Sequence, residues 1–297
     1  MTVVPIESAD PHLTPVSRHH VETGRANLFT IQRGKGSPTI VLLHGVTANA
    51  WVWEPVMDIL CPSYRVVAID QRGHGRTGGA RDGAYDAASY ARDIADLAVA
   101  LGGAPVVVAG HSLGSRNALH AAAMSPDLIA GVVAIDFTPF IEDSVFDSLQ
   151  KRVDAGSRGF ADLDEVRSYL RDRYPRLPSE AIERRAVNGY TTLRTGLVRP
   201  LADTEAMTRT CVGLRSDLSQ VVRDVTVPFV LVRGRDSTLV SPEAFAATCR
   251  LRPDVPAIVV DDADHYVPEE QPGVVARIIA DMAEAVSGKS SEEGARS

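Results

Sequence analysis

The fold of this chain is decided by residues 106–114, which read VVVAGHSLG. Four small or β-branched apolar residues predict a buried strand, and the pattern G-x-S-x-G follows them directly. The next residues, Ser115–Met124, have a helical pattern. A serine at the apex of so sharp a turn needs small residues two positions away on each side, and Gly110 and Gly114 provide them. We therefore expect Ser112 to be a nucleophile that faces the dipole of the following helix.

Outward from this stretch, short apolar runs alternate with helical patterns along the chain. Six runs predict buried strands: Thr39–Leu43, Tyr64–Ile69, Pro105–Ala109, Ile129–Ile135, Val227–Val232 and Pro256–Val260. Helices are expected at Tyr85–Leu101, Leu113–Met124, Pro242–Cys249 and Pro272–Val286. This alternation predicts an α/β fold with right-handed crossovers and a mostly parallel sheet. Ligands of such sheets bind at the carboxyl ends of the strands.

One segment, residues 137–223, interrupts this alternation. It contains no convincing strand, and its helical patterns cover Val145–Ala155, Leu163–Tyr174 and Ser179–Asn188. We interpret it as a helical cap inserted between two strands of a core formed by residues 1–136 and 224–288. The Ser-, Gly- and Glu-rich residues 289–297 are expected to be a disordered tail.

The composition is that of a globular protein with an acidic surface. The chain has 297 residues, of which 44% are hydrophobic, and 31 Lys and Arg against 38 Asp and Glu give a net charge of -7. A negative balance without basic clusters argues against a nucleic-acid partner. We therefore expect a small-molecule substrate. The substrate can be acidic, because a pocket can be locally basic in an acidic protein.

The sequence also bears on location. No run of about 18 apolar residues exists, which excludes a membrane-spanning helix. The first twenty residues lack the apolar region of a signal peptide. Cys61, Cys211 and Cys249 match no metal-binding spacing, so we expect reduced thiols, a cytoplasmic protein and no metal.

An oxyanion hole requires two backbone N–H groups directed at one oxygen. The residue after the nucleophile, Leu113, is expected to supply the first. The second is expected from Val46, because Gly45 allows the chain to turn after the strand that ends at Leu43. The side chain of His44 is expected to brace this loop.

The general base is sought among eight histidines. His265 follows the last predicted strand, in the chain order nucleophile, acid, base. His111 lies inside the sharp turn and is expected to point away from the site. His74 belongs to residues 70–75, DQRGHG, which we interpret as a structural loop. We therefore expect His265 to be the base.

Two aspartates could orient His265. Asp236 follows the fifth predicted strand, which is the commoner position for the acid, and Asp136 follows the fourth. Both strand ends lie between those that carry Ser112 and His265. The residues alone leave both carboxylates open as partners of the imidazole.

Other motifs carry little weight. Residues 73–78 match G-x-G-x-x-G, but no apolar helix follows them, which argues against dinucleotide binding. Asp261, Asp262 and Asp264 lie in one loop and would form a poor metal cage. We expect neither a cofactor nor a metal.

These motifs identify a family resemblance. The chain resembles the α/β-hydrolase superfamily from about Asn27 to Val286, which implies a mostly parallel eight-stranded sheet flanked by helices, with an inserted helical cap. Within it, the chain resembles the (E)-2-(acetamidomethylene)succinate hydrolases. The similar strings are residues 70–75, 110–114, 133–139 (VAIDFTP), 213–218 (GLRSDL) and 263–267 (ADHYV).

This resemblance implies site residues. In that family the acid follows the strand after the nucleophile helix, which implies Asp136. Asp236 has no counterpart in that family, and this departure keeps it as an alternative acid. The substrate of that family is a small dicarboxylate enamide, and arginines and a tyrosine of the cap bind its carboxylates. By position, these residues resemble Arg152, Arg173 and Tyr174. A guanidinium group pairs bidentately with a carboxylate.

The resulting hypothesis is a Ser-His-Asp hydrolase that cleaves the amide bond of a small carboxylate-bearing substrate through an acyl-enzyme. A carboxylesterase or lactonase with the same machinery is the first alternative, and a C–C bond hydrolase the second. A ligand receptor with a vestigial triad is the alternative from a different functional class. The partners expected are a small-molecule substrate and a second copy of the chain in a homodimer.

Overall fold

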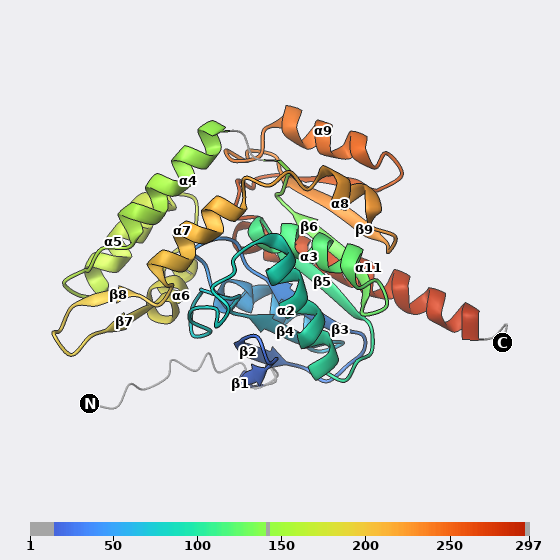
Figure 1. Cartoon of the computed structure of the whole chain (residues 1–297), viewed down its shortest axis with the longest axis horizontal. Coiled ribbons are helices and arrows are strands. Elements are labelled where there is room, and N and C mark those ends of the chain that lie inside the picture. Colours follow the sequence, from blue (N-terminus) through green and yellow to red (C-terminus); the bar gives the residue numbers. More distant parts are fainter. Residues whose placement is uncertain (1–14, 141–142, 295–297) are drawn as a thin grey trace.

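Residues 15–140 and 143–294 are described by the computed structural model, which is organised around one eight-stranded sheet (Figure 1). The strand order is β1-β2-β4-β3-β5-β6-β9-β10. The strands are β1 (Ser17–Glu22), β2 (Asn27–Arg33), β3 (Thr39–Leu43), β4 (Arg65–Ile69), β5 (Val106–His111), β6 (Ile129–Ile135), β9 (Phe229–Gly234) and β10 (Ala257–Val260). β2 pairs antiparallel with both β1 and β4, and all other pairs are parallel. The predicted fold class is confirmed.

Helices cover both faces of the sheet and thereby bury its central strands on both sides, as the fully buried β5 shows. Along β5, Val107 and Ala109 face the layer that contains the 3-10 helix η1 (Ala50–Trp53), α1 (Glu54–Leu60) and α11 (Pro272–Gly294). Val106 and Val108 face the opposite layer. That layer contains α2 (Ala87–Ala100), α3 (Leu113–Met124), α8 (Ser219–Asp224) and α9 (Pro242–Leu251). Each fully buried Val, Leu or Ile side chain contributes about 1.5–3 kcal/mol.

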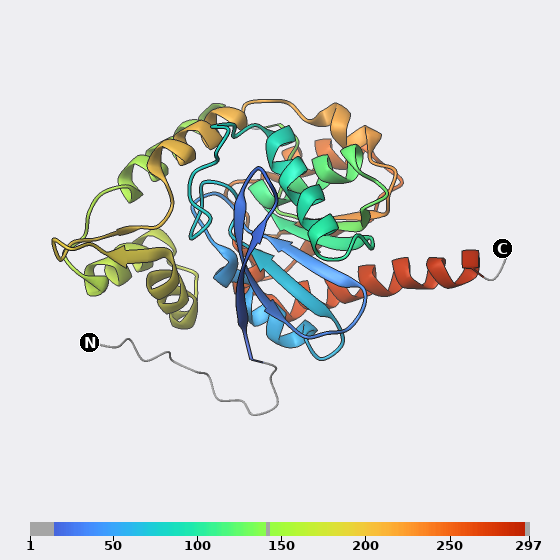
Figure 2. The same cartoon turned by 60° about the horizontal axis from the view of Figure 1, so that its bottom comes forward.

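The inserted segment lies between β6 and β9. Besides α8, which packs on the sheet, its helices are α4 (Asp143–Gly156), α5 (Leu163–Arg173), α6 (Ser179–Gly189) and α7 (Thr204–Gly213). They lie together beside the sheet in both views (Figure 1, Figure 2). The segment also contains two short antiparallel strands, β7 (Tyr190–Thr192) and β8 (Val198–Pro200). The expectation of no strand here was wrong, because a three-residue strand carries too little periodicity to be recognised.

The carboxyl-terminal helix is longer than its sequence pattern suggested. α11 continues to Gly294 and therefore includes most of the segment expected to be a disordered tail. Residues 295–297 lie outside the described part of the chain. A short helix, α10 (Val267–Glu270), follows β10 and connects it to α11. In the ranges that the structure covers, no helix is long and apolar enough to cross a membrane.

Candidate active site

The turn after β5 holds Ser112 in a strained conformation. Ser112 has φ 54° and ψ -113°, a region that few residues with a side chain adopt. Its N–H donates to Ile135 O at 2.9 Å, which fixes the turn against β6. A Cβ on Gly110 would lie 2.3 Å from the carbonyl carbon of Gly114, and one on Gly114 would lie 2.2 Å from Leu43 O. Only glycine fits at either position, so the motif directly reflects the packing of the turn.

The imidazole of His265 is paired with Asp136. His265 Nδ1 lies 2.6 Å from Asp136 Oδ2, and both side chains are buried. Asp136 has φ 48° and accepts two further hydrogen bonds, from Gly234 N at 2.9 Å and from Ser237 Oγ at 2.6 Å. These donors fix the carboxylate, which in turn fixes the ring and leaves Nε2 as the nitrogen available for proton transfer.

Asp236 lies elsewhere. Its carboxylate forms an ion pair with Arg176 Nη1 at 2.9 Å, and both side chains are more than two-fifths exposed. Asp236 is the second residue after β9, whereas Asp136 directly follows β6. The structure therefore brings only Asp136 to the imidazole.

The sequence suggested that His111 points away from the site, but the structure shows that it lines the same pocket as Ser112 and His265. His111 Nε2 lies 2.7 Å from His265 O, so this nitrogen carries a hydrogen and donates to the carbonyl. The two rings lie 4.7 Å apart. Burial, and then the nearby His265, keep the pKa of His111 well below the usual value for histidine. A neutral His111 therefore connects the turn of Ser112 to the loop of His265.

Both expected oxyanion donors are placed beside Ser112. Leu113 is the first residue of α3, and its N–H has no partner within the helix. Val46 follows Gly45 in the loop after β3, and a Cβ on Gly45 would lie 3.3 Å from Ser112 Cβ. In residues 15–140 and 143–294, neither the Val46 nor the Leu113 N–H donates a hydrogen bond.

Ser112 and His265 line one cavity, called here the strand-end pocket. Its other walls come from residues 44–48 after β3, called here the oxyanion loop, from the start of α3, from the cap and from the loops after β6, β9 and β10. They are Gly45, Val46, Thr47, Ala48, His111, Leu113, Arg116, Asp136, Phe137, Thr138, Val145, Leu149, Arg152, Arg173, Arg185, Leu214, Leu239, Val240 and Tyr266. Four arginines line a cavity in a chain of negative net charge. The pocket is therefore locally basic.

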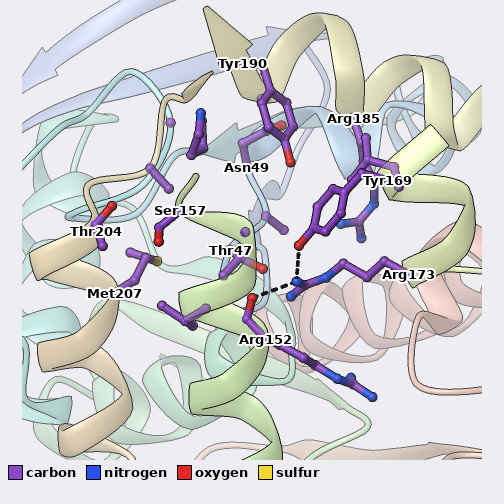
Figure 3. A pocket seen from close by; sticks show the side chains of 18 of the residues that line it. Thr47, Asn49, Arg152, Ser157, Tyr169, Arg173, Arg185, Tyr190, Thr204 and Met207 are labelled. Atoms are coloured by element: carbon purple, nitrogen blue, oxygen red, sulfur yellow. Dashed lines mark hydrogen bonds between the residues drawn. The ribbon is translucent and has the colours of Figure 1, made fainter. Parts of the chain in front are cut away.

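A second cavity, called here the cap pocket, lies against the same arginines (Figure 3). Arg152, Arg173 and Arg185 line both cavities. Arg173 Nη1 donates to Tyr169 Oη at 2.6 Å and to Arg152 O at 2.8 Å, as the dashed lines in Figure 3 show. Arg173 Nε donates to Tyr174 Oη at 2.9 Å. Within residues 15–140 and 143–294, Arg173 is thus held by neutral oxygens alone.

The arginines of this wall differ in how their charge is balanced. Arg185 forms a bidentate ion pair with Glu269, and both side chains are buried. The guanidinium group of Arg152 has no ion-pair or hydrogen-bond partner among the residues described. Arg173 has no carboxylate partner there either. Two positive charges at the pocket wall are therefore available to an anionic ligand.

The tyrosine expected at the site, Tyr174, packs between these charges. The guanidinium carbon of Arg185 lies 4.5 Å from the centre of the Tyr174 ring and 5.2 Å from that of Tyr266. Burial acts to raise the pKa of Tyr174, but Arg173 and Arg185 together lower it below the usual value for tyrosine. Tyr174 lines the cap pocket, not the strand-end pocket.

Sequence reasoning missed four residues of this site, namely Arg116, Arg185, Ser237 and Glu269. Ser237 holds Asp136, and Glu269 holds Arg185. Arg116 is buried and donates to Pro139 O at 3.1 Å and to Ser216 O at 2.8 Å, the segments that enter and leave the cap. Burial lowers the pKa of Arg116 to about 10, so it stays charged at neutral pH. Only the position of Arg116, one helical turn after Ser112, gave a signal in the sequence.

No metal site is evident in the part of the chain that the structure covers, where no three side chains of His, Cys, Asp or Glu gather as ligands would. In the acidic loop near His265, Asp261 pairs with Arg235, and Asp264 accepts from Thr238 N at 2.8 Å. These carboxylates have structural partners.

A buried strand, a strained serine, an Asp–His pair and two free N–H groups are the defining elements of one class of enzyme. Residues 40–278 match the Alpha/beta hydrolase family, and the chain belongs to this family. It is an α/β-hydrolase enzyme, as the resemblance in the sequence implied.

Some relatives within this family are named for specific substrates. The chain is 47% identical, over 89% of its length and 94% of the relative, to 2-(acetamidomethylene)succinate hydrolase of Mesorhizobium japonicum. A crystal structure of E-2-(acetamidomethylene)succinate hydrolase matches with a TM-score of 0.87 and 46% identity, over 91% of this chain and 100% of that one. Esterase Rv0045c of Mycobacterium tuberculosis is 26% identical, with 87% of each chain covered.

Proposed function

We propose that this chain is a serine hydrolase that cleaves an amide bond of a small dicarboxylate, with Ser112 as nucleophile, His265 as base and Asp136 as the acid. Ser112 Oγ attacks the carbonyl carbon while His265 Nε2 takes its proton. The N–H groups of Val46 and Leu113 stabilise the oxyanion. His265 then protonates the leaving nitrogen, and the C–N bond breaks. Water, deprotonated by His265, hydrolyses the acyl-serine and restores Ser112.

The observation that carries the substrate class is the charge of the pocket wall. Arg152 and Arg173 line the same cavity as Ser112 and have no carboxylate partner among the residues described. A substrate with two carboxylates would supply two negative charges to this wall. Charged hydrogen bonds of this kind contribute about 1.5–3 kcal/mol each. The relative that is 47% identical is named for a succinate derivative that carries an acetamido group, which agrees with this charge pattern.

Ester cleavage uses the same groups, so turnover of a simple ester does not distinguish an amidohydrolase from an esterase. The deciding experiment compares an N-acyl enamine dicarboxylate with p-nitrophenyl acetate in steady-state kinetics. We expect a higher kcat/KM for the dicarboxylate and, by mass spectrometry after rapid quenching, an acyl group on the peptide that contains Ser112. A preference for the simple ester would support the esterase alternative instead.

A further inference from the structure

The oxyanion loop is held by a buried network of three side chains, His44, Gln71 and Asn117, none of which lines the strand-end pocket. Their exposed fractions are 0%, 1% and 0%. His44 directly follows β3, Gln71 comes two residues after β4, and Asn117 lies in α3. The network therefore joins the loop of Val46 to the helix that begins with Leu113.

Hydrogen bonds fix the tautomer of His44. Gln71 N donates to His44 Nε2 at 3.1 Å, so Nε2 must be the unprotonated nitrogen. Nδ1 then carries the hydrogen and donates to Gly45 O at 2.7 Å. Burial, followed by the neighbouring His74, lowers the pKa of His44 well below the usual value, so the neutral ring persists at neutral pH.

The Gly45 carbonyl determines where the Val46 N–H points. Both groups belong to one trans peptide unit, in which the C=O and the N–H point in opposite directions. The carbonyl also accepts Ala48 N at 3.2 Å, which closes a turn that contains Thr47 at φ 63°. With the carbonyl tied to His44 Nδ1, rotation of this peptide would break two hydrogen bonds.

The rest of the network sets this peptide relative to α3. Gln71 Nε2 donates to His44 O at 2.6 Å, and Gln71 Oε1 accepts from Asn117 Nδ2 at 2.7 Å. We infer that His44 and Gln71 are positioning residues, which direct the Val46 N–H toward the oxygen that the Leu113 N–H also serves. This inference rests on the proposed acyl chemistry at Ser112.

Two substitutions of His44 separate this role from simple bracing. In His44→Asn the side-chain amide nitrogen falls near the place of Nδ1 and can still donate to Gly45 O. In His44→Gln the amide falls near the place of Nε2 and can still accept from Gln71 N. Each variant keeps one of the two hydrogen bonds, so their effects on stability should be similar. Only the asparagine keeps the bond that orients the peptide.

The measurement is kcat for p-nitrophenyl acetate per active site, with sites titrated by a fluorophosphonate. Misdirecting one oxyanion donor should cost about 10- to 100-fold, somewhat less than its complete loss. We expect this fall in His44→Gln, with rescue to within a few-fold of wild type in His44→Asn. The Ki of methaneboronic acid, which forms a tetrahedral adduct on the serine, should rise by the same factor in His44→Gln. Gln71→Met should show a fall in the same direction, with KM little changed.

Equal losses in both His44 variants, or full kcat and boronate affinity in His44→Gln, would overturn the inference. Failure of the proposed acyl chemistry at Ser112 would appear differently, because Ser112→Ala would then retain p-nitrophenyl acetate turnover. A dead Ser112→Ala variant together with an unaffected His44→Gln variant would overturn the positioning role alone.

Discussion

The two sides of the strand-end pocket are built on different principles. On the core side, backbone geometry places the groups: Ser112 and Asp136 have positive φ, and the Val46 and Leu113 N–H groups come from the ends of a strand and a helix. On the cap side, the groups are long side chains. We propose that the core supplies the chemistry, and that the cap supplies the preference for charged substrates.

The sides also differ in how fully their polar groups are satisfied. On the core side, the Asp136 carboxylate accepts three hydrogen bonds. On the cap side, Arg173 donates to three neutral oxygens and to no carboxylate in the described part of the chain. Arg173 is only partly buried, and desolvating a cation that lacks a carboxylate partner costs free energy that a bound anion can recover. We therefore expect a carboxylate ligand to bind on the cap side.

The largest expected effect is loss of the nucleophile on the core side. Ser112→Ala should lower kcat by about 10⁴-fold or more on every substrate, because no acyl-enzyme can form. Steady-state kinetics on the dicarboxylate amide and on p-nitrophenyl acetate measure this, with circular dichroism as the control for folding. Retention of turnover on either substrate would place the chemistry elsewhere.

The next effect distinguishes two aspartates. Asp136→Asn should lower kcat by about 10³- to 10⁴-fold, because His265 loses the partner that fixes its tautomer. Asp236→Asn is the matched control and should change kcat less than threefold, about the effect of losing a surface ion pair. If the variant at 236 were the inactive one, the assignment of the acid from the geometry would be wrong.

A smaller and selective effect is expected on the cap side. Arg152→Met and Arg173→Met should each lower kcat/KM for the dicarboxylate by about 10- to 100-fold, through lost charged hydrogen bonds. The kcat for p-nitrophenyl acetate should change only a few-fold. A matched control is Arg176→Met, because Arg176 pairs with Asp236 and Glu270 and lines neither pocket. Equal losses on charged and neutral substrates would contradict a role in selection.

The smallest effect is on the pH dependence of the free energy of unfolding. It tests a further difference between the two sides, because buried histidines of the core can titrate, whereas arginines of the cap stay charged. Burial lowers the pKa of His74 to about 4. The folded state then binds fewer protons than the unfolded state between about pH 4 and 6.5, so this contribution to stability is complete above pH 6.5 and is lost as the pH falls. We expect the free energy of unfolding to drop by about 1 kcal/mol between pH 6.5 and 5.5 through this group.

Urea denaturation at a series of pH values measures this drop. His74→Asn removes the titrating ring, while its amide can still donate to Arg72 O, the acceptor of His74 Nδ1. The variant should have a shallower pH dependence by up to one proton. An unchanged slope would show that His74 is not among the groups responsible.

The same division explains what the sequence could predict. Ser112 and Leu113 followed from a motif whose glycines are required by close backbone contacts, and His265 followed from its place after the last strand. The choice between Asp136 and Asp236 required the structure. Residues alone do not give the reach of a side chain from the end of one strand to the loop after another.

The functional residues of the cap side were harder to predict because no local sequence motif identifies them. Arg185 is one of many arginines in the cap, and its pairing with Glu269 joins residues 84 positions apart. The β7–β8 hairpin had one signal, Gly196, which has φ 87° in the connecting turn. Strands of three residues are too short for a periodicity to emerge, so tertiary packing determines them.

The central claim, that the core performs the chemistry while cap charges select the substrate, is tested most directly by one ratio. The measurement compares kcat/KM for an N-acyl enamine dicarboxylate with that for the same enamide bearing two carboxamides, in wild type and in Arg152→Met/Arg173→Met. We expect a wild-type ratio of about 100 or more that falls close to one in the double variant, while kcat/KM for the neutral compound stays within a few-fold. A ratio that survives the loss of both arginines would contradict the account.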